Sequence, residues 1–292
     1  MMTKILFIIN PISGVGRKDI LPDLIEKHLD HSIYTPTIVH TEYRKHAKEI
    51  AKEYADKGWD VICAVGGDGS VHEVGTALIG TQTKLAIIPT GSGNGLARHL
   101  HIPMQIDKAI ELLNKQESIL MDTVLVNDKP FLNAAGYGID AFIAKKFNDS
   151  PRRGLINYVR LSLKEFVHYE PVRISMQING ITRSLKVFML SIANASEFGN
   201  GFCISPESDV TDGKIELVLV KPIKFWDVPK LTYQFFNRKS NNSEFLEVIP
   251  FEKATINIDH ELAQYDGEPF QVRKELNVEV VPKSLHILVG KK

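Results

Sequence analysis

Residues 61–70 read VICAVGGDGS, a run of apolar residues that leads directly into a loop with three glycines. The same arrangement occurs at residues 4–17 (KILFIINPISGVGR) and at residues 85–95 (LAIIPTGSGNG). Short, continuous apolar runs that alternate with helical patterns are typical of parallel strands covered on both faces by helices. The first part of the chain therefore predicts an α/β layer with a mostly parallel sheet. Ligands bind such sheets at the carboxyl ends of the strands, where the three glycine loops would meet.

The second part of the chain has a different pattern. From about residue 118 onward, short segments of alternating polarity such as 173–177 and 214–220 are separated by the turn pairs Asn179-Gly180 and Asp212-Gly213. This pattern predicts a mostly antiparallel β domain, interrupted by one helix at residues 154–169. We expect two domains, residues 1–120 and 121–292, with a last strand that is able to return to the first domain.

The overall composition is that of a globular protein. The 292 residues are 43% hydrophobic and 24% charged, and 35 basic side chains balance 35 acidic ones. These values exclude disorder, coiled coil and collagen for the whole chain, and zero net charge argues against a nucleic-acid partner. Cys63 and Cys203 stand far apart without a zinc-ligand spacing, and we find neither a signal peptide nor a membrane-spanning run. We therefore expect a cytoplasmic protein.

The glycine loops suit a polyphosphate ligand. Glycine lets the backbone approach a ligand closely, a helix N-terminus behind the loop attracts anions, and Arg17 would add a positive charge. Tight turns without a ligand are the alternative explanation for any single loop. The P-loop, the dinucleotide-binding GxGxxG pattern and the protein kinase motifs are absent. Asp68 lies inside a glycine loop, where a carboxylate beside phosphates indicates phosphoryl transfer with Mg²⁺.

These motifs resemble those of a known family. Three segments resemble the nucleotide-site motifs of the diacylglycerol kinase and sphingosine kinase catalytic family. They are residues 10–16, residues 66–70 followed by His72-Glu73-Val74, and residues 89–94. The GGDG element alone also resembles NAD kinases and phosphofructokinases. Further similar motifs are Phe131–Ala141, Asn194 with Gly199–Gly201, Asp212-Gly213 and Asp266-Gly267-Glu268. The resemblance implies an NAD kinase-like or phosphofructokinase-like α/β nucleotide domain followed by an antiparallel β-sandwich.

The resemblance also implies roles for single residues. The ATP site would consist of Asn10, Ser13, Gly14, Arg17, Thr41, Gly66, Gly67, Asp68, Gly69, Ser70, Glu73 and Ser92. Asp68 and Glu268 would be catalytic, and which of the two is the base stays open. A structural Mg²⁺ would bind the side chain of Asp212 and the backbone of Asp209 and Lys214. Without the resemblance, the Asp-Gly pairs also fit ordinary hairpin turns.

One departure from the family bears on the substrate. Gly95 stands where many bacterial glycerolipid kinases have an aspartate, which removes one carboxylate from the implied magnesium network. In that detail the loop resembles the form found in sphingosine and ceramide kinases. Asp140 would then receive the cationic amine of a sphingoid base, or it would cap the next helix.

Together these observations predict an ATP- and Mg²⁺-dependent lipid kinase that acts on a diacylglycerol-like or sphingoid hydroxyl. The alternatives are a soluble-substrate kinase of the NAD kinase type and a catalytically silent nucleotide- or lipid-binding protein. Residues 145–186 carry nine basic and three acidic side chains around the apolar helix 154–169. We expect transient contact of this region with the inner membrane surface, with a core helix as the alternative, and we also consider a homodimer.

Overall fold

The fold is described from a computed structural model. It covers residues 2–11, 20–139, 169–259, 262–266, 268–271 and 274–291. The predicted helix 154–169 lies outside these described residues except for its last position. The chain divides into two compact units, residues 1–123 with 282–292, and residues 124–281.

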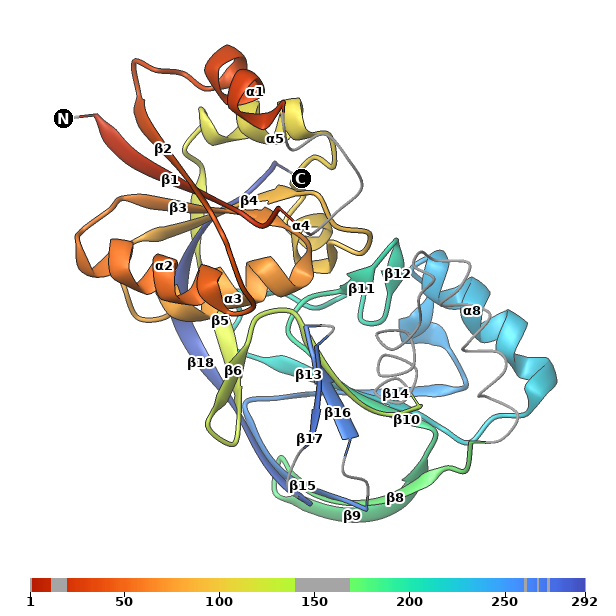
Figure 1. The fold of residues 1–292 in the computed structure, drawn as a ribbon. Helices are drawn as coiled ribbons and strands as arrows, with labels where there is room; N and C mark the ends of the chain where they lie inside the picture. Colours follow the sequence, from red (N-terminus) through yellow and green to blue (C-terminus); the bar gives the residue numbers. More distant parts are fainter. Residues whose placement is uncertain are drawn as a thin grey trace. The chain divides into compact units, whose positions relative to one another are not determined.

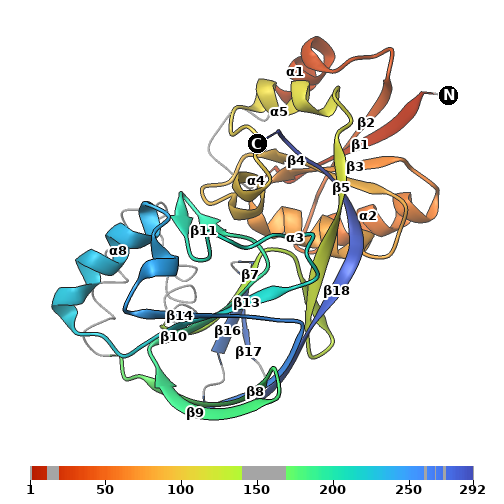
Figure 2. The same cartoon turned by 180° about the vertical axis from the view of Figure 1, so that it is seen from behind.

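The first unit is a parallel sheet between two layers of helices (Figures 1 and 2). The strand order is β2-β1-β3-β4-β18, and every pair in it is parallel. Helices α1 and α5 cover one face, and α2 and α3 cover the other. Its elements are β1 (Thr3–Ile9), α1 (Leu21–His28), β2 (Tyr34–His40), α2 (His46–Asp56), β3 (Val61–Gly66), α3 (Asp68–Leu78), β4 (Lys84–Pro89), α4 (Gly95–His99), α5 (Ile106–Leu113), most of β5 (Ser118–Val126) and the end of β18 (Glu275–Leu288).

The apolar runs of the sequence account for this sheet. Residues 5–9 of β1, 61–65 of β3 and 85–88 of β4 are all at most 2% exposed. Each residue of such a strand faces one of the two helical layers, so that no position is left for a polar side chain. The predicted parallel α/β layer is confirmed.

The second unit is a sandwich of two sheets. One sheet has the order β14-β13-β10-β7-β16-β17 and is antiparallel throughout its registered pairs, and the other continues from the first part of β18 through β15 and β8 to β9. Its strands are β6 (Lys129–Phe131), β7 (Ala134–Gly138), β8 (Val172–Ile178), β9 (Ile181–Val187), β10 (Met189–Ala193), β11 (Glu197–Gly199), β12 (Phe202–Cys203), β13 (Ile215–Val220), β14 (Leu246–Phe251), β15 (Lys253–Ile258), β16 (Leu262–Tyr265) and β17 (Glu268–Gln271). The helical segments are η1 (Phe225–Asp227), α8 (Val228–Phe236) and η2 (Ser240–Asn242).

Inward-facing side chains of both sheets form the core of this unit. Tyr137 and Leu217 from one sheet and Met176 and Ile256 from the other belong to the same buried cluster. The turn pair Asn179-Gly180 joins β8 to β9, and both of its residues have positive φ (50° and 76°), as the tight hairpin requires. The predicted antiparallel β-sandwich is confirmed.

Within the described part of the chain, every helix is too short or too polar to span a bilayer.

Candidate nucleotide and phosphoryl-transfer site

Four strands of the first unit end at the same level. Ile9 pairs with His40 on one side and with Val65 on the other, and Gly66 pairs with Pro89. Backbone hydrogen bonds continue this register just past the strands. They run from Thr41 N to Ile9 O (2.9 Å) and from Thr90 N to Gly66 O (2.9 Å). The predicted residues Asn10, Thr41 and Gly66 and the third glycine loop therefore lie along one edge of the sheet.

The second and third glycine loops pack directly against each other. A Cβ atom built on Gly91 would lie 2.5 Å from the Cα of Gly67 and 2.8 Å from Oδ1 of Asn94. A Cβ on Gly67 would in turn lie 3.2 Å from the Cα of Gly91. Carbon atoms in contact are normally at least about 3.5 Å apart. Glycine is therefore required at Gly91 for the loops to approach each other, apart from any ligand, and a side chain at Gly67 would also press on the neighbouring loop.

Asp68 joins the same two loops. It is the first residue of α3, and its carboxylate accepts the backbone N–H groups of Asn94 (Oδ2, 2.8 Å) and Gly95 (Oδ1, 2.8 Å) at the start of α4. A carboxylate at a helix N-terminus is favourable because the free N–H groups there carry partial positive charge. A carboxylate has about four lone-pair sites in all, and these two bonds use two of them. Asp68 thus has a structural role in addition to the chemical role predicted for it.

Asn94 holds the third glycine loop in shape. Its backbone is left-handed (φ 54°), and its side chain bonds the backbone of Gly91 twice, through Oδ1 to N (3.1 Å) and through Nδ2 to O (2.8 Å). In this loop Ser92 is exposed. The hydroxyl of Thr90 is buried and has no hydrogen-bond partner among the described residues. Sequence reasoning chose Ser92 from this loop and missed Thr90, although Thr90 is the first hydroxyl after the strand.

Glu73 and Ser70 lie on α3, behind the second glycine loop. Ser70 is buried, and Oε1 of Glu73 accepts the backbone N–H of Lys45 (3.1 Å) just before α2. Glu73 therefore ties α3 to the start of the neighbouring helix. Three other residues predicted for the ATP site, Ser13, Gly14 and Arg17, lie outside the described residues. So does the predicted substrate residue Asp140.

Asp266 anchors the turn that precedes Glu268 in the second unit. It is 6% exposed, and its carboxylate accepts three consecutive backbone N–H groups, those of Leu132 (Oδ2, 3.1 Å), Asn133 (Oδ1, 2.9 Å) and Ala134 (Oδ1, 3.2 Å). Its own N–H donates to the carbonyl oxygen of Ala134 (2.9 Å). The turn is thereby fixed to the start of β7. Sequence reasoning offered two interpretations of Asp266-Gly267-Glu268, a family motif and an ordinary hairpin turn, and missed this clamp.

Glu268 is the first residue of β17. The backbone of β17 pairs with β16, and Tyr265 lies opposite Glu268 across the hairpin. The side chain of Glu268 is outside what the structure describes. The clamp at Asp266 therefore determines where the backbone of Glu268 lies within the second unit.

The segment 208–216 carries the residues predicted for a structural Mg²⁺. Oδ1 of Asp212 accepts the backbone N–H of Lys214 (2.8 Å), and Oδ1 of Asp209 accepts both the backbone N–H (2.9 Å) and the hydroxyl (2.7 Å) of Thr211. Glu216 on β13 is 7% exposed. Burial raises the pKa of Glu216 to about 7, and the negative charges of Asp212 and Asp209 add to this effect.

The donor chemistry of this segment fits a hard cation. Carboxylate and carbonyl oxygens are the ligands that Mg²⁺ prefers, and the neighbouring negative charges favour a cation over an anion. Within the described residues, no group of three or more Asp, Glu, His or Cys side chains is arranged to hold a metal ion. A site at this turn would therefore use the carboxylate of Asp212 together with backbone oxygens.

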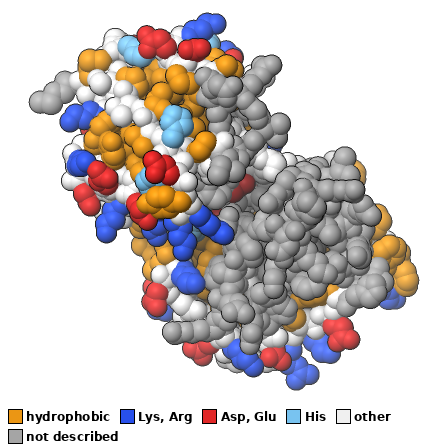
Figure 3. Space-filling model, viewed as in Figure 1, with side chains coloured by type: hydrophobic (Ala, Val, Ile, Leu, Met, Phe, Trp, Pro, Cys, Tyr) orange, Lys and Arg blue, Asp and Glu red, His pale blue; other side chains and the backbone are white. Residues whose placement is uncertain are grey.

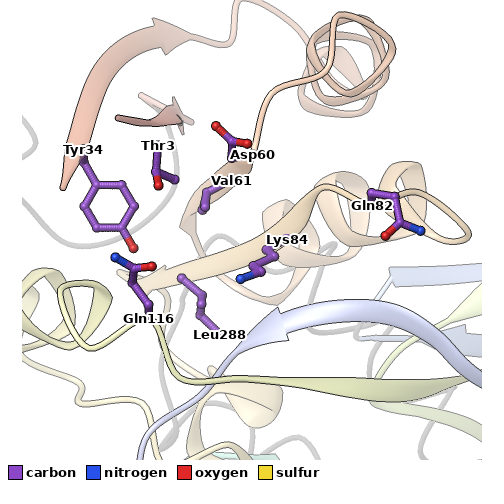
Figure 4. A pocket seen from close by; sticks show the side chains of 8 residues that line it. All are labelled: Thr3, Tyr34, Asp60, Val61, Gln82, Lys84, Gln116 and Leu288. Atoms are coloured by element: carbon purple, nitrogen blue, oxygen red, sulfur yellow. The ribbon is translucent and has the colours of Figure 1, made fainter. Parts of the chain in front are cut away.

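A pocket lies at the opposite end of the first sheet (Figure 4). It is lined by the first residues of four strands, Thr3, Tyr34, Val61 and Lys84. The other lining residues are Asp60, Gln82, Gln116 and Leu288. Burial raises the pKa of Tyr34 to about 12, and its hydroxyl donates to the carbonyl oxygen of Leu113 (2.8 Å). Because the pocket is at the amino ends of the strands, it is not part of the glycine-loop site.

Comparisons with known proteins agree with this geometry. Residues 4–126 match the diacylglycerol kinase catalytic domain, and residues 133–289 match the YegS C-terminal NAD kinase beta sandwich-like domain. The chain is 32% identical to an uncharacterized protein of Synechocystis over 73% of its length, and it spans 52% of the length of that relative. It is 28% identical to a probable lipid kinase, YegS-like, of Yersinia enterocolitica, with 82% of each chain covered.

A solved structure supports the fold. The crystal structure of a diacylglycerol kinase from Bacillus anthracis superposes with a TM-score of 0.76 at 20% identity, and the match covers 98% of this chain and 97% of that one. Two family models in the expected order, with the glycine loops in the first and the Asp-Gly-Glu turn in the second, cover almost the whole sequence. The chain therefore belongs to the family of lipid kinases that contains the diacylglycerol kinase catalytic domain and the YegS-type proteins.

Proposed function

We propose that the protein transfers the γ-phosphoryl group of ATP to a hydroxyl group of a diacylglycerol-like or sphingoid lipid, in a reaction that depends on Mg²⁺. The observation that carries the proposal is the edge where β1 to β4 end together. There Asp68 and the contact between Gly67 and Gly91 lock two glycine loops into one structure. Phosphoryl transfer requires mainly positioning and neutralisation of charge, and a rigid edge of backbone N–H groups and hydroxyls suits both.

The residues along this edge would bind the nucleotide. Asn10, Thr41, Gly66–Gly67 and Ser70 would surround the phosphates, with the hydroxyl of Thr90 as a further donor. Asp68 would keep its bonds to the third loop and would help to hold the catalytic Mg²⁺ or orient the attacking hydroxyl. Glu268 would accept the proton of the lipid hydroxyl. A bound Mg²⁺ would neutralise phosphate charge, and a structural Mg²⁺ would stabilise the turn at Asp212.

The acceptor lipid is the finer part of the proposal. Gly95 supplies only its backbone N–H to Asp68 and no carboxylate of its own. The magnesium network would therefore have one carboxylate fewer than in many glycerolipid kinases. This favours a sphingoid base as one acceptor to be tested, and Asp140 would then pair with its amine.

The decisive experiment incubates the purified protein with γ-labelled ATP, Mg²⁺ and separate acceptors. The acceptors are diacylglycerol, sphingosine, ceramide, a total lipid extract, a sugar phosphate and NAD. We expect label in a chloroform-soluble product and expect it to disappear with a chelator. Asp140→Asn should lower turnover of sphingosine and not of diacylglycerol.

Variants test the role of the proposed base. Glu268→Gln should abolish transfer, whereas Glu252→Gln, at an exposed glutamate of the same unit, should retain it. Near-normal turnover in Glu268→Gln would refute the role of Glu268 as a base. If no lipid is labelled while ATP still binds, the lipid kinase proposal is wrong for this chain.

A second candidate function is kinase activity on NAD. It is favoured by the match of residues 133–289 to a domain described as NAD kinase-like and by the GGDG element. In the same experiment this function would give a labelled, water-soluble product with NAD and none with the lipids.

A further inference from the structure

An exposed aromatic surface lies on the second unit, in a segment that contains none of the motifs discussed above. Residues 221–239 read KPIKFWDVPKLTYQFFNRK. Within them η1 leads directly into α8, and four large aromatic side chains are exposed: Phe225 (55%), Trp226 (71%), Tyr233 (58%) and Phe236 (39%). We call these four residues and the basic residues 221, 224, 230, 238 and 239 around them the α8 surface. Figure 3 shows hydrophobic side chains at the edge of the molecule where Figure 1 places α8.

The exposed rings are not the result of a helix that failed to pack. The inner side of α8 is well buried, with Leu231 7% exposed and Phe235 4% exposed in a hydrophobic cluster. The ring of Phe235 lies 4.4 Å from that of Phe202, measured between centroids. Tyr233 and Phe236 are three residues apart on α8, a spacing that puts them on one side of the helix, and Trp226 lies in η1 just before it. The ring of Phe236 also meets that of Phe202 edge-on, with 5.7 Å between the centroids. The helix therefore has a satisfied inner face and a second, outer face that is aromatic.

Basic side chains outnumber acidic ones around these rings. Residues 221–239 contain five basic side chains and one acidic side chain, Asp227. Two lysines lie over exposed rings, Lys224 at 5.2 Å from the centre of Trp226 and Lys239 at 5.9 Å from the centre of Tyr233. The charges of the other basic residues are partly compensated, since Lys230 pairs with Glu244 and Arg238 pairs with Glu197.

We propose that the α8 surface docks on an anionic lipid bilayer. Tryptophan, tyrosine and phenylalanine insert into the boundary between headgroups and acyl chains, while lysines beside them bind the phosphates of anionic lipids. A protein partner of ordinary composition would not require lysines over two of the four exposed rings. The inference rests on the proposed function, because a lipid acceptor has to be reached within a bilayer. It is independent of residues 145–186, for which membrane contact was predicted from the sequence.

The two tryptophans of the chain permit a direct test of contact. Trp59 lies in the first unit, where its ring meets that of Tyr54 edge-on. In the variant Trp59→Phe, Trp226 is the remaining tryptophan and reports on the α8 surface alone. We expect its emission to shift to the blue, and to be quenched by brominated lipid, on phosphatidylcholine vesicles that contain phosphatidylglycerol. Pure phosphatidylcholine vesicles and high salt should weaken both effects.

Sedimentation with the same vesicles measures the contribution of charge and of the rings. Each basic side chain near an anionic surface contributes about fivefold in partitioning, so Lys224→Gln with Lys239→Gln should lower partitioning roughly thirtyfold. Trp226→Ser with Tyr233→Ser should also lower it. The matched control is Ile181→Ser, which removes an exposed apolar side chain (59%) from β9 and should leave partitioning unchanged.

Kinase assays with two forms of the acceptor separate this inference from the proposed function. With a short-chain lipid dissolved as monomers, the variants of the α8 surface should turn over like the wild type, whereas with the same acceptor class in vesicles they should be slower. If the wild type phosphorylates no lipid at all, the proposed function fails while the sedimentation result still decides the docking inference. Unchanged partitioning and emission in the variants would overturn docking. Light scattering tests the other possible occupant of this surface. If the wild type is a dimer and the ring variants are monomers, the docking inference is also overturned, because the α8 surface would then bind a second copy of the chain.

Discussion

The carboxylate of Asp266 is expected to contribute more to stability than any other acidic side chain for which contacts are described above. Its two oxygens accept three backbone N–H groups, from Leu132 at 3.1 Å, Asn133 at 2.9 Å and Ala134 at 3.2 Å, and the residue is 6% exposed. In Asp266→Asn the remaining carbonyl oxygen keeps two of these bonds in weakened form. The new NH₂ group faces a buried N–H donor, most directly that of Leu132.

The expected cost follows from these contacts. A hydrogen bond to a charged group contributes about 1.5–3 kcal/mol, and a buried donor without a partner costs about 1–3 kcal/mol. Loss of one charged bond and weakening of two others should therefore lower the free energy of unfolding by about 2–4 kcal/mol. The same free energy corresponds to amide hydrogen exchange roughly 30- to 700-fold faster at the three backbone N–H groups, if they exchange through local opening.

Urea denaturation followed by tryptophan emission measures the first effect, and exchange of the amides of residues 132–134 measures the second. The matched control is Asp259→Asn, whose side chain is 80% exposed and lies 3.6 Å from Lys274. This control should change stability by less than about 0.5 kcal/mol. A loss below about 0.5 kcal/mol in Asp266→Asn, with unchanged amide exchange, would show that the three bonds do not anchor the turn.

Three further perturbations address other parts of the molecule. Gly91→Ala puts a Cβ atom 2.5 Å from the Cα of Gly67, so it should lower the free energy of unfolding by about 1–3 kcal/mol and weaken ATP binding. Urea denaturation measures the first effect and titration calorimetry the second. Wild-type stability and ATP affinity in this variant would contradict the packing of the two loops. Asp68→Asn keeps one acceptor for the N–H groups of residues 94 and 95 but loses the negative charge. The variant should therefore still fold but lose phosphoryl transfer in the kinase assay. Normal transfer would show that Asp68 takes no part in the chemistry. Glu216 has a pKa of about 7 in the folded protein against an ordinary value of 4.5, so the folded state binds more protons and stability should fall as pH rises between these values. Glu216→Gln should accordingly be more stable than the wild type above about pH 8, by up to ~3 kcal/mol, and should gain no stability below about pH 4. Urea titrations without metal ions measure both values. Equal stability of variant and wild type at both pH values would contradict a buried carboxylate.

The parallel sheet was predictable because its strands are buried on both faces. Residues 5–9, 61–65 and 85–88 are uninterrupted apolar runs, and such runs fit few other structures when glycine loops and helical patterns follow them. The hairpin at Asn179-Gly180 was predictable for a local reason as well, since that pair tolerates the positive φ that its turn needs.

The candidate site was predictable in its position and less so in its contacts. The glycine loops and Asp68 were chosen from local sequence, and the structure brings them together at one edge of the sheet. The clamp of Asp266 on residues 132–134 was missed because its partners are backbone groups more than 130 positions away, and backbone groups leave no signal in the sequence. The buried hydroxyl of Thr90 was missed because burial of a single loop side chain depends on its neighbours. The exposed rings on α8 were missed because an aromatic residue in a sequence is more often part of a core.

The sequence by itself determined the two fold classes, their order and the three glycine loops, because these depend on local patterns of polarity and on the conformational freedom of glycine. Only the tertiary structure decided why the glycines are needed where they are. Gly67 and Gly91 stand 24 positions apart, yet they touch across two loops, and Asp68 caps the helix that follows the second of them. Contacts of this kind arise when strands are placed side by side in a sheet, and that placement follows from the burial of the whole core rather than from any single stretch of sequence.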